Sequence, residues 1–474
     1  MSLNAPTTSN FKENVHDALA DANLQAALRG SRTGFTGKRA AAIARLPEFD
    51  RLRDQARDIK NHVLANLDSY LEEYEAKVIE AGGQVHWAET AEDARRIVLD
   101  ICRAAGAKTV NKGKTMISEE CGINDHLADN GIEAVETDLG EYVIQLRGET
   151  PSHIIAPAIH VTVDQVRETF RKAHADLPAD RDLDGLDTML AEARSVLRKK
   201  YFEAEVGITG ANMLIAETGQ SVIVTNEGNG DLSQSLPRVH IVMASLEKTV
   251  ATLDDASTIL RILARSATGQ EMAVYTTFSS GPRREKDPDG PEEFHVVLLD
   301  NGRSNMLGTD FQDMLRCIRC GACMNHCPVY QAVGGHAYGW VYPGPMGAVL
   351  TPSLIGVEKG GQLPNASTFC GKCEDVCPMR IPLPKMMRHW REREFEKNLA
   401  PVAQRWGLGL WAFAARRAWL YRIVTGLGTG ALRLLAGRRG ALSRLPMAGG
   451  WTSHRDLPRP QGATFMSQVK RRGR

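Results

Sequence analysis

The sequence predicts an α/β domain, followed by a smaller cysteine-rich domain and a basic helical tail. Between about residues 84 and 300, short β-rich runs alternate with helical stretches, which is typical of an α/β domain. Seven of the nine cysteines lie between Cys317 and Cys377 and mark a second domain. The segment from Pro401 to Arg474 contains fourteen Lys and Arg residues and a single acid, Asp456. The 474 residues are enough for two or three domains.

The N-terminal part of the chain is predicted to be helical. Residues 1–50 form a helical extension, because apolar residues recur there at loosely helical spacing. A long helix is expected from about Leu52 to Ala81, where two glycines end it. A short strand follows at Gln84–Ala88, and Thr90 starts a further helix with Asp93 as a capping acid.

The α/β domain is expected to span residues 51–300. Within it, Ser118 is predicted to open a helix with acids in its first turn, where the helix dipole favours them. Helices are also expected in Asp182–Glu205 and Ala256–Ser266. The predicted strands are Thr109–Asn111, Ile132–Glu136, Tyr142–Leu146, His153–Ala156, Val206–Thr209, Met213–Ala216, Ser221–Thr225, His240–Met243, Met272–Thr277 and His295–Leu299.

The first cysteine run has the spacing of a bacterial ferredoxin. It reads Cys317-x2-Cys320-x2-Cys323-x3-Cys327-Pro328. In such a run the first three cysteines hold one cubane and the fourth crosses to another. A zinc site fits poorly, because zinc sites usually use paired cysteines with a long spacer. Residues 301–400 are therefore predicted to form an α-helical, ferredoxin-like iron–sulfur domain.

The second run, Cys370-x2-Cys373-x3-Cys377-Pro378, lacks one cysteine, and Ser367 stands in its place. The first cluster, a 4Fe-4S cubane, is expected to take Cys317, Cys320, Cys323 and Cys377. The second is expected to take Cys327, Cys370 and Cys373. With three thiolates, the second is a 3Fe-4S cluster, a 4Fe-4S cluster with an oxygen or partner ligand, or a 4Fe-4S cluster with an open iron.

Cysteine usage also bears on the compartment of the protein. The remaining cysteines, Cys102 and Cys121, are predicted to be buried core thiols. This usage fits a reducing cytoplasm better than a disulfide scaffold. No apolar core of signal-peptide length is expected in the first thirty residues.

A Gly/Pro/aromatic linker joins the two cysteine runs and includes Gly334–Gly339 and Tyr342–Pro345. It is predicted to pack over the clusters. The alternative is that His336, Tyr338 or Tyr342 lines an electron-exit or quinone-type site.

The tail, residues 401–474, mixes Trp and aliphatic residues with arginines. Because the arginines interrupt the apolar run, a membrane-spanning helix is not expected. The tail either docks on the protein body or a partner subunit, or lies on an anionic membrane surface at the inner face. No nucleic-acid recognition motif accompanies it, so no nucleic-acid partner is expected.

The α/β domain carries a candidate substrate pocket. A lysine-bearing loop at Lys112–Thr115 joins a predicted strand to a helix and suits an anion. It lacks the P-loop pattern, and no Rossmann fingerprint opens the domain. Glycine-rich turns further along allow close backbone approach to a ligand. The candidate pocket residues are Lys112, Lys114, Glu119, Glu120, Glu217, Thr218, Asn226 and Glu227.

Several motifs in order resemble the LUD domain. They are Ser118–Asn124, Gly210–Asn212, Ala216–Gly219, Thr225–Gly230, Ser266–Gln270 and Leu299–Arg303. Together with the cysteine runs and the linker, the chain from about residue 50 onward resembles the lactate utilisation iron–sulfur protein B family.

The resemblance implies a fold similar to the sugar-phosphate isomerases and CoA-transferases, without their catalysis. It implies an assembly with a cysteine-rich-repeat protein and a second LUD protein that oxidises L-lactate to pyruvate and supports growth on lactate. This chain would be the electron-transfer subunit, delivering electrons to a membrane or quinone-linked acceptor. The alternatives are a metabolite-binding redox-sensing or assembly module, and the same role for another 2-hydroxy acid.

Overall fold

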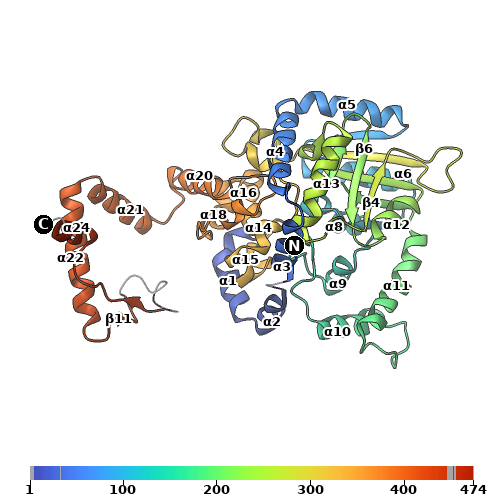
Figure 1. The fold of residues 1–474 in the computed structure, drawn as a ribbon. Helices are drawn as coiled ribbons and strands as arrows, with labels where there is room; N and C mark the ends of the chain where they lie inside the picture. The colour runs from blue at the N-terminus through green and yellow to red at the C-terminus, as the bar shows by residue number, and fades with distance from the viewer. Residues whose placement is uncertain (1–4, 32–33, 446–451, 453–454, 473–474) are drawn as a thin grey trace. The chain divides into compact units, whose positions relative to one another are not determined.

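The computed structural model describes residues 5–31, 34–445, 452 and 455–472 (Figure 1). The chain divides into two compact units, Met1–Glu394 and Phe395–Arg474. The first unit contains both the α/β part and the cysteine-rich part, so these two share one body.

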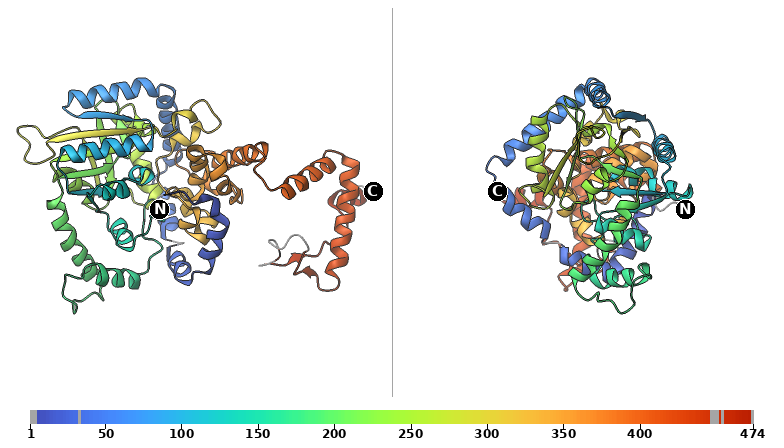
Figure 2. Two further views of the ribbon diagram at one scale, coloured as in Figure 1. Left: turned by 180° about the vertical axis from the view of Figure 1, so that it is seen from behind. Right: turned by 90° about the vertical axis from the view of Figure 1, so that its right-hand side faces the viewer.

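A six-stranded, fully parallel sheet forms the centre of the α/β part (Figures 1 and 2). Its strand order is β1-β10-β7-β4-β2-β3. This confirms the α/β class expected from the alternating pattern. The strands are β1 (Gln84–Ala88), β2 (Thr109–Gly113), β3 (Glu133–Glu136), β4 (Val206–Gly210), β7 (Val239–Ser245) and β10 (Glu293–Leu299).

Helices bury both faces of this sheet. Ile241 and Met243 of β7 belong to the core cluster that α6 (Ala91–Ala104) supplies, while Val242 and Ala244 belong to the one that α5 (Leu67–Glu80) joins. Alternate residues of one strand therefore point into opposite layers, and every residue of β7 is buried. The expected capping box at Thr90 and Asp93 starts α6.

A second, mixed sheet of four strands lies beside the first, in the order β8-β5-β6-β9. Gly219 closes the β5–β6 hairpin with φ +68, and a Cβ there would lie 2.7 Å from the backbone of Lys77. Only glycine fits this approach. The strands are β5 (Met213–Ile215), β6 (Gln220–Thr225), β8 (Thr249–Val250) and β9 (Tyr275–Ser279).

The remaining helices of the α/β part connect the strands or cover them. They are α4 (Phe49–Ala65), α7 (Met116–Cys121), α8 (Ile123–Asp129), α9 (Leu139–Arg147), α10 (Val163–Ala173), α11 (Leu186–Glu203), α12 (Asn229–Ser235) and α13 (Leu253–Ala267), with the 3-10 turns η2 (Leu246–Lys248) and η3 (Ser304–Met306).

Two predicted strands are wrong. Tyr142–Leu146 lies in α9, because the Asp138 side chain accepts hydrogen bonds from the N–H groups of Gly140 and Glu141 and so caps a helix. His153–Ala156 is a loop, because the His153 ring accepts from the N–H groups of Ile155 and Ala156. Local side-chain bonds outweighed the apolar, β-prone composition in both segments.

Two helix predictions also need correction. The single helix expected from Leu52 to Ala81 is divided at Asn66 into α4 and α5. The helix expected to open at Ser118 begins two residues earlier, because the Thr115 hydroxyl accepts from the Ser118 N–H.

The N-terminal extension packs on the cysteine-rich part and is helical, as expected. Gln25 donates to the Ala332 carbonyl at 2.8 Å, and Arg39 donates to the Val376 carbonyl at 2.8 Å. The helices are η1 (Thr8–Asn10), α1 (Phe11–Ala20), α2 (Ala22–Ser31) and α3 (Gly34–Ala44). The extension thus braces the segment that carries the cysteines.

Short helices build the cysteine-rich part. Each cysteine run turns at a left-handed glycine, Gly321 with φ +71 and Gly371 with φ +80, directly before a one-turn helix. The helices are η4 (Gln312–Arg316), α14 (Ala322–Asn325), α15 (Pro328–Val333), η5 (His336–Tyr338), α16 (Gly344–Ile355), α17 (Val357–Gly360), α18 (Gln362–Asn365), α19 (Lys372–Asp375) and α20 (Leu383–Glu396).

The second unit is largely helical and exposes large apolar side chains, among them Trp406, Trp411 and Trp419. Its elements are α21 (Val402–Ala415), α22 (Ala418–Ala436), β11 (Ala441–Leu442), β12 (Leu457–Pro458) and α24 (Phe465–Arg472). Within the described residues, no helix has the length and apolar content needed to cross a membrane.

A buried charge network fastens the cysteine-rich part to the α/β part. Arg303, which is 1% exposed, forms ion pairs with Glu120 at 2.6 Å and Glu247 at 3.1 Å. Glu247 also pairs with Arg319 at 3.1 Å, and the Tyr342 hydroxyl donates to Glu120 at 2.5 Å. Burial alone would raise the pKa of Glu247, but Arg303 and Arg319 lower it to about 2.

We expect Arg303→Met to lower the free energy of unfolding by about 3–5 kcal/mol, because it removes the shared cation from two buried carboxylates and leaves Glu120 with neutral donors only. Urea unfolding of the anaerobic, cluster-loaded protein measures this. Arg45→Met is the matched control: Arg45 pairs with Glu271 at 2.9 Å on the surface, and its loss should cost less than about 1 kcal/mol. An equal decrease in the free energy of unfolding in the two variants would contradict a stabilising role of the buried network.

Candidate functional site

Four cysteines of the two runs converge on one cavity. Its wall contains Cys317, Cys320, Cys323 and Cys377, set among apolar side chains. The Arg319 N–H donates to the Cys317 sulfur at 3.4 Å. Four thiols around one cavity, with a backbone donor to sulfur, fit an iron–sulfur cubane.

The other three cysteines line a second cavity, together with Ser367. These cysteines are Cys327, Cys370 and Cys373. The Ser367 hydroxyl accepts from the Phe369 N–H at 3.2 Å, so its oxygen is held beside this cavity. Cys370 is exposed, whereas every cysteine of the first cavity is buried or partly buried. The two sites therefore differ in both donor set and access to solvent.

The aromatic linker packs into the interior. Tyr338 is 2% exposed and lines the second cysteine cavity, and Tyr342 is fully buried against Glu120. His336, by contrast, is exposed, and its ring nitrogen donates to the Thr150 carbonyl at 2.6 Å. These contacts favour the packing interpretation over an exposed exit site.

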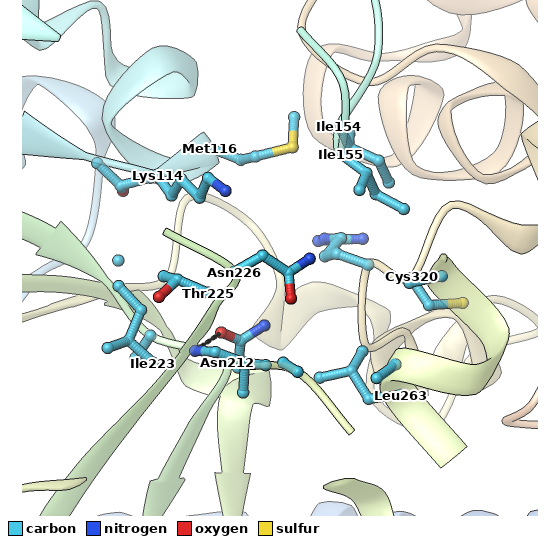
Figure 3. Close-up of a pocket in the computed structure, with 18 of the residues that line it drawn as sticks. Lys114, Met116, Ile154, Ile155, Asn212, Ile223, Thr225, Asn226, Leu263 and Cys320 are labelled. Carbon is cyan, nitrogen blue, oxygen red and sulfur yellow. Dashed lines mark hydrogen bonds between the residues drawn. The ribbon is translucent and has the colours of Figure 1, made fainter. Parts of the chain in front are cut away.

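A third cavity, of about 180 Å³, opens between the α/β part and the first cysteine run (Figure 3). The ends of β2 and β6 bring Lys114 and Asn226 to it, and the segment between β4 and β5 brings Asn212. In Figure 3, Asn226 points into the space between Lys114 and Cys320. The cavity is concave and polar on one side, as ligand sites usually are.

The third cavity and the first cysteine cavity share a wall. Ile154, Arg319 and Cys320 line both of them. A molecule in the third cavity would therefore lie directly behind a predicted cluster ligand.

One carboxyl group also faces the third cavity. Burial, and then the nearby carboxylates of Glu136 and Asp138, raise the pKa of Glu141 well above its ordinary value. A carboxyl group with a raised pKa is suited to proton transfer near neutral pH.

The predicted pocket residues separate into two groups. Lys114 and Asn226 line the third cavity, and Glu227 pairs with Lys114 at 2.7 Å. The other predicted residues lie elsewhere. Lys112 forms buried ion pairs with Glu119 and Glu136, Glu120 belongs to the Arg303 network, Glu217 accepts from the Leu253 N–H, and Thr218 bonds Gln220.

Sequence reasoning missed Asn212, Glu141, Lys248 and Arg319 as cavity residues. A signal for Lys248 was present: it follows the apolar strand β7, and ligands bind beyond the carboxyl ends of parallel strands. Arg319 stands between two cysteines of the first run, but nothing in that run indicates that it faces another domain.

Comparison with known proteins agrees with this division of the chain. Residues 71–299 match the LUD domain and residues 313–381 match the 4Fe-4S dicluster domain. The protein is thus of the class that joins a LUD domain to a site for two iron–sulfur clusters.

Full-length relatives identify the family. The chain is 40% identical to "Lactate utilization protein B" of Bacillus licheniformis over 461 residues, covering 97% of this chain and 96% of the relative. It is 40% identical to the protein of the same name from an Exiguobacterium species, with both chains fully covered. It is 38% identical to the "Uncharacterized electron transport protein YkgF" of Escherichia coli, covering 99% and 98%. The chain belongs to the lactate utilization protein B family.

Iron content tests the two cysteine cavities separately. We expect Cys323→Ala to remove the iron of the first site and Cys373→Ala that of the second, because each loses a thiolate from a different cavity. Anaerobic iron and sulfide quantitation with EPR measures both.

Cys102→Ser is the control for these variants, because Cys102 is fully buried in the core formed with α6. It should keep all of its iron. Loss of the same iron in Cys323→Ala and Cys373→Ala would contradict two separate sites.

Proposed function

We propose that this chain is the iron–sulfur electron-transfer subunit of a complex that oxidises L-lactate to pyruvate. One observation carries the proposal: Arg319 and Cys320 form a common wall between a substrate-sized cavity and a four-cysteine cavity. The names of the relatives, which refer to lactate utilization and electron transport, agree with it. Pyruvate formation removes two electrons and two protons from lactate.

The ligand sets follow the two cavities. Cys317, Cys320, Cys323 and Cys377 would hold a 4Fe-4S cluster, and Cys327, Cys370 and Cys373 would hold a 4Fe-4S or 3Fe-4S cluster. Clusters of this kind supply one-electron transfer. The chain itself orients the cysteines, sets the first site among apolar side chains and presents sulfur at the cavity wall.

The partners we propose are a cysteine-rich-repeat protein and a second LUD protein, in the cytoplasm. The second unit would bind a partner subunit or the inner membrane surface near a quinone-linked acceptor. Its exposed tryptophans among arginines support either role. The parallel sheet agrees with a likeness to the sugar-phosphate isomerase and CoA-transferase folds.

Dye reduction by L-lactate tests the proposal in the reconstituted complex. We expect Cys320→Ser to lower the rate by about tenfold or more, because a serine oxygen replaces a cluster thiolate beside the cavity. Cys102→Ser should retain the wild-type rate. Undiminished turnover in Cys320→Ser would exclude electron transfer through this site.

A redox-sensing module is the second candidate, because one observation favours it: the three-cysteine site is open to solvent at Cys370. EPR during lactate addition separates the two functions. Cluster reduction within the turnover time supports electron transfer, whereas oxygen-dependent loss of the second cluster's signal, without reduction by lactate, supports sensing.

Ser367→Cys tests the chemistry of the second site. We expect the variant to bind about one more iron per chain if the wild type holds a 3Fe-4S cluster, because the new thiolate completes the donor set. Iron quantitation and the EPR signal measure this. Unchanged iron and spectra would indicate that a complete cubane is already bound by another ligand.

A further inference from the structure

We propose that the third cavity binds the carboxylate of a small 2-hydroxy acid through the ammonium of Lys248 and the side-chain amide of Asn212. The inference rests on the proposed function and locates the substrate on this chain, at the boundary of its two parts, instead of on a companion subunit.

Lys248 is a buried residue whose ammonium is attracted by Glu247 and Cys317 but forms no close ion pair with them. It is 8% exposed and lines the cavity. The other buried lysines of the described chain are satisfied: Lys60 donates to the carbonyls of Glu247 and Thr249, and Lys112 pairs with Glu119 and Glu136. Among the described residues, Lys248 has neither a hydrogen bond nor an ion pair. A buried ammonium is costly unless an anion meets it.

Among the described cations that line the cavity, Lys248 is the one without a carboxylate at ion-pair distance, because Lys114 pairs with Asp138 and Glu227, and Arg319 pairs with Glu247. Lys248 and Arg319 face the cavity from one side, and Arg319 shares its carboxylate, Glu247, with Arg303. Glu141 is the only carboxylate among the described lining residues, and burial raises its pKa well above the ordinary value, which favours the neutral form. An anion in the cavity would supply the ion pair that Lys248 lacks.

Asn212 supplies a directed donor. Its Oδ1 accepts from the Val224 N–H at 2.9 Å, drawn as the dashed line in Figure 3. This bond fixes the orientation of the amide, so the Nδ2 group, which donates to none of the described residues, remains free. Asn226, by contrast, uses both amide atoms: its Nδ2 donates to Gln270 Oε1, and its Oδ1 accepts from Gln270 Nε2.

The size of the cavity agrees with a three-carbon acid. Its volume of about 180 Å³ is many times the space that one ordered water needs. Such an acid would lie against Cys320, the residue that this cavity shares with the first cysteine cavity.

The competing role for Lys248 is to balance the negative charge of the first cluster. Cys317, a predicted ligand of that cluster, attracts the Lys248 ammonium, which supports this role. The lining of the cavities supports the carboxylate, because Lys248 lines the third cavity and not the cysteine cavity, whereas Arg319 lines both. The experiment must nevertheless separate these two roles.

L-lactate is the probe, with lactamide as its neutral analogue, added to the full-length, cluster-loaded chain under anaerobic conditions. We expect lactate, but not lactamide, to bind in calorimetry and to raise the unfolding midpoint. Lys248→Met and Asn212→Asp should each weaken lactate binding by about tenfold or more. Asn212→Asp keeps the acceptor for Val224 and replaces the donor with a negatively charged oxygen, which repels a carboxylate. Lys199→Gln, on the exposed side of α11, is the charge-matched control and should bind as the wild type does.

Lys248→Met has a second expected effect. Because it removes an unpaired buried charge, it should raise the unfolding midpoint of the lactate-free protein and leave the potential of the first cluster nearly unchanged. A lowered midpoint with a shifted potential and unaltered lactate binding would overturn the inference in favour of charge balance at the cluster.

The remaining outcomes separate this inference from the proposed function. Absence of lactate binding to the wild-type chain overturns the inference, and if lactate still reduces the clusters of the complex, the proposed function stands. Binding that depends on Lys248, in a complex whose clusters lactate never reduces, supports the inference and contradicts the electron-transfer function.

Discussion

The position of Arg303 between Glu120 and Glu247 is the interaction on which the rest of the structure depends. Arg303 follows β10, while its partners come from α7 and the turn after β7, and the same carboxylates hold Arg319 and Tyr342 of the cysteine-rich part. A buried network of this kind tolerates little displacement, because each lost contact leaves a charge without a partner. It therefore fixes the first cysteine run against the end of the sheet.

Two consequences follow from this attachment. Arg319, Cys320 and Tyr342 complete a cavity whose other walls come from the LUD domain, and the two cysteine sites have different surroundings. The first has four thiols and shares a wall with the cavity of the LUD domain, whereas the second has three thiols and is exposed at Cys370. The first site would suit electron transfer from a substrate in the adjoining cavity. The second site would suit electron transfer to an external acceptor.

Periodicity and capping predicted much of the fold, and particular residues explain where they failed. All six strands of the main sheet were anticipated, because apolar runs such as the one in β7 are buried on both faces. The strand expected at Tyr142–Leu146 became α9 because Asp138 caps it, and the one expected at His153–Ala156 became a loop held by the His153 ring. In the candidate site, only Lys114 and Asn226 of the eight predicted pocket residues line the cavity, because the others found partners elsewhere in the folded chain.

The sequence by itself determined the chemistry of the protein: the two cysteine runs, the serine in place of an eighth cysteine, and the order of an α/β domain before an iron–sulfur domain. These depend on local spacing, which is readable along the chain. Only the tertiary structure decided that Lys248 stays unpaired at a cavity wall and that Arg319 and Cys320 complete that wall. Such features depend on contacts between charged residues that are far apart in the sequence, and local spacing does not predict those contacts.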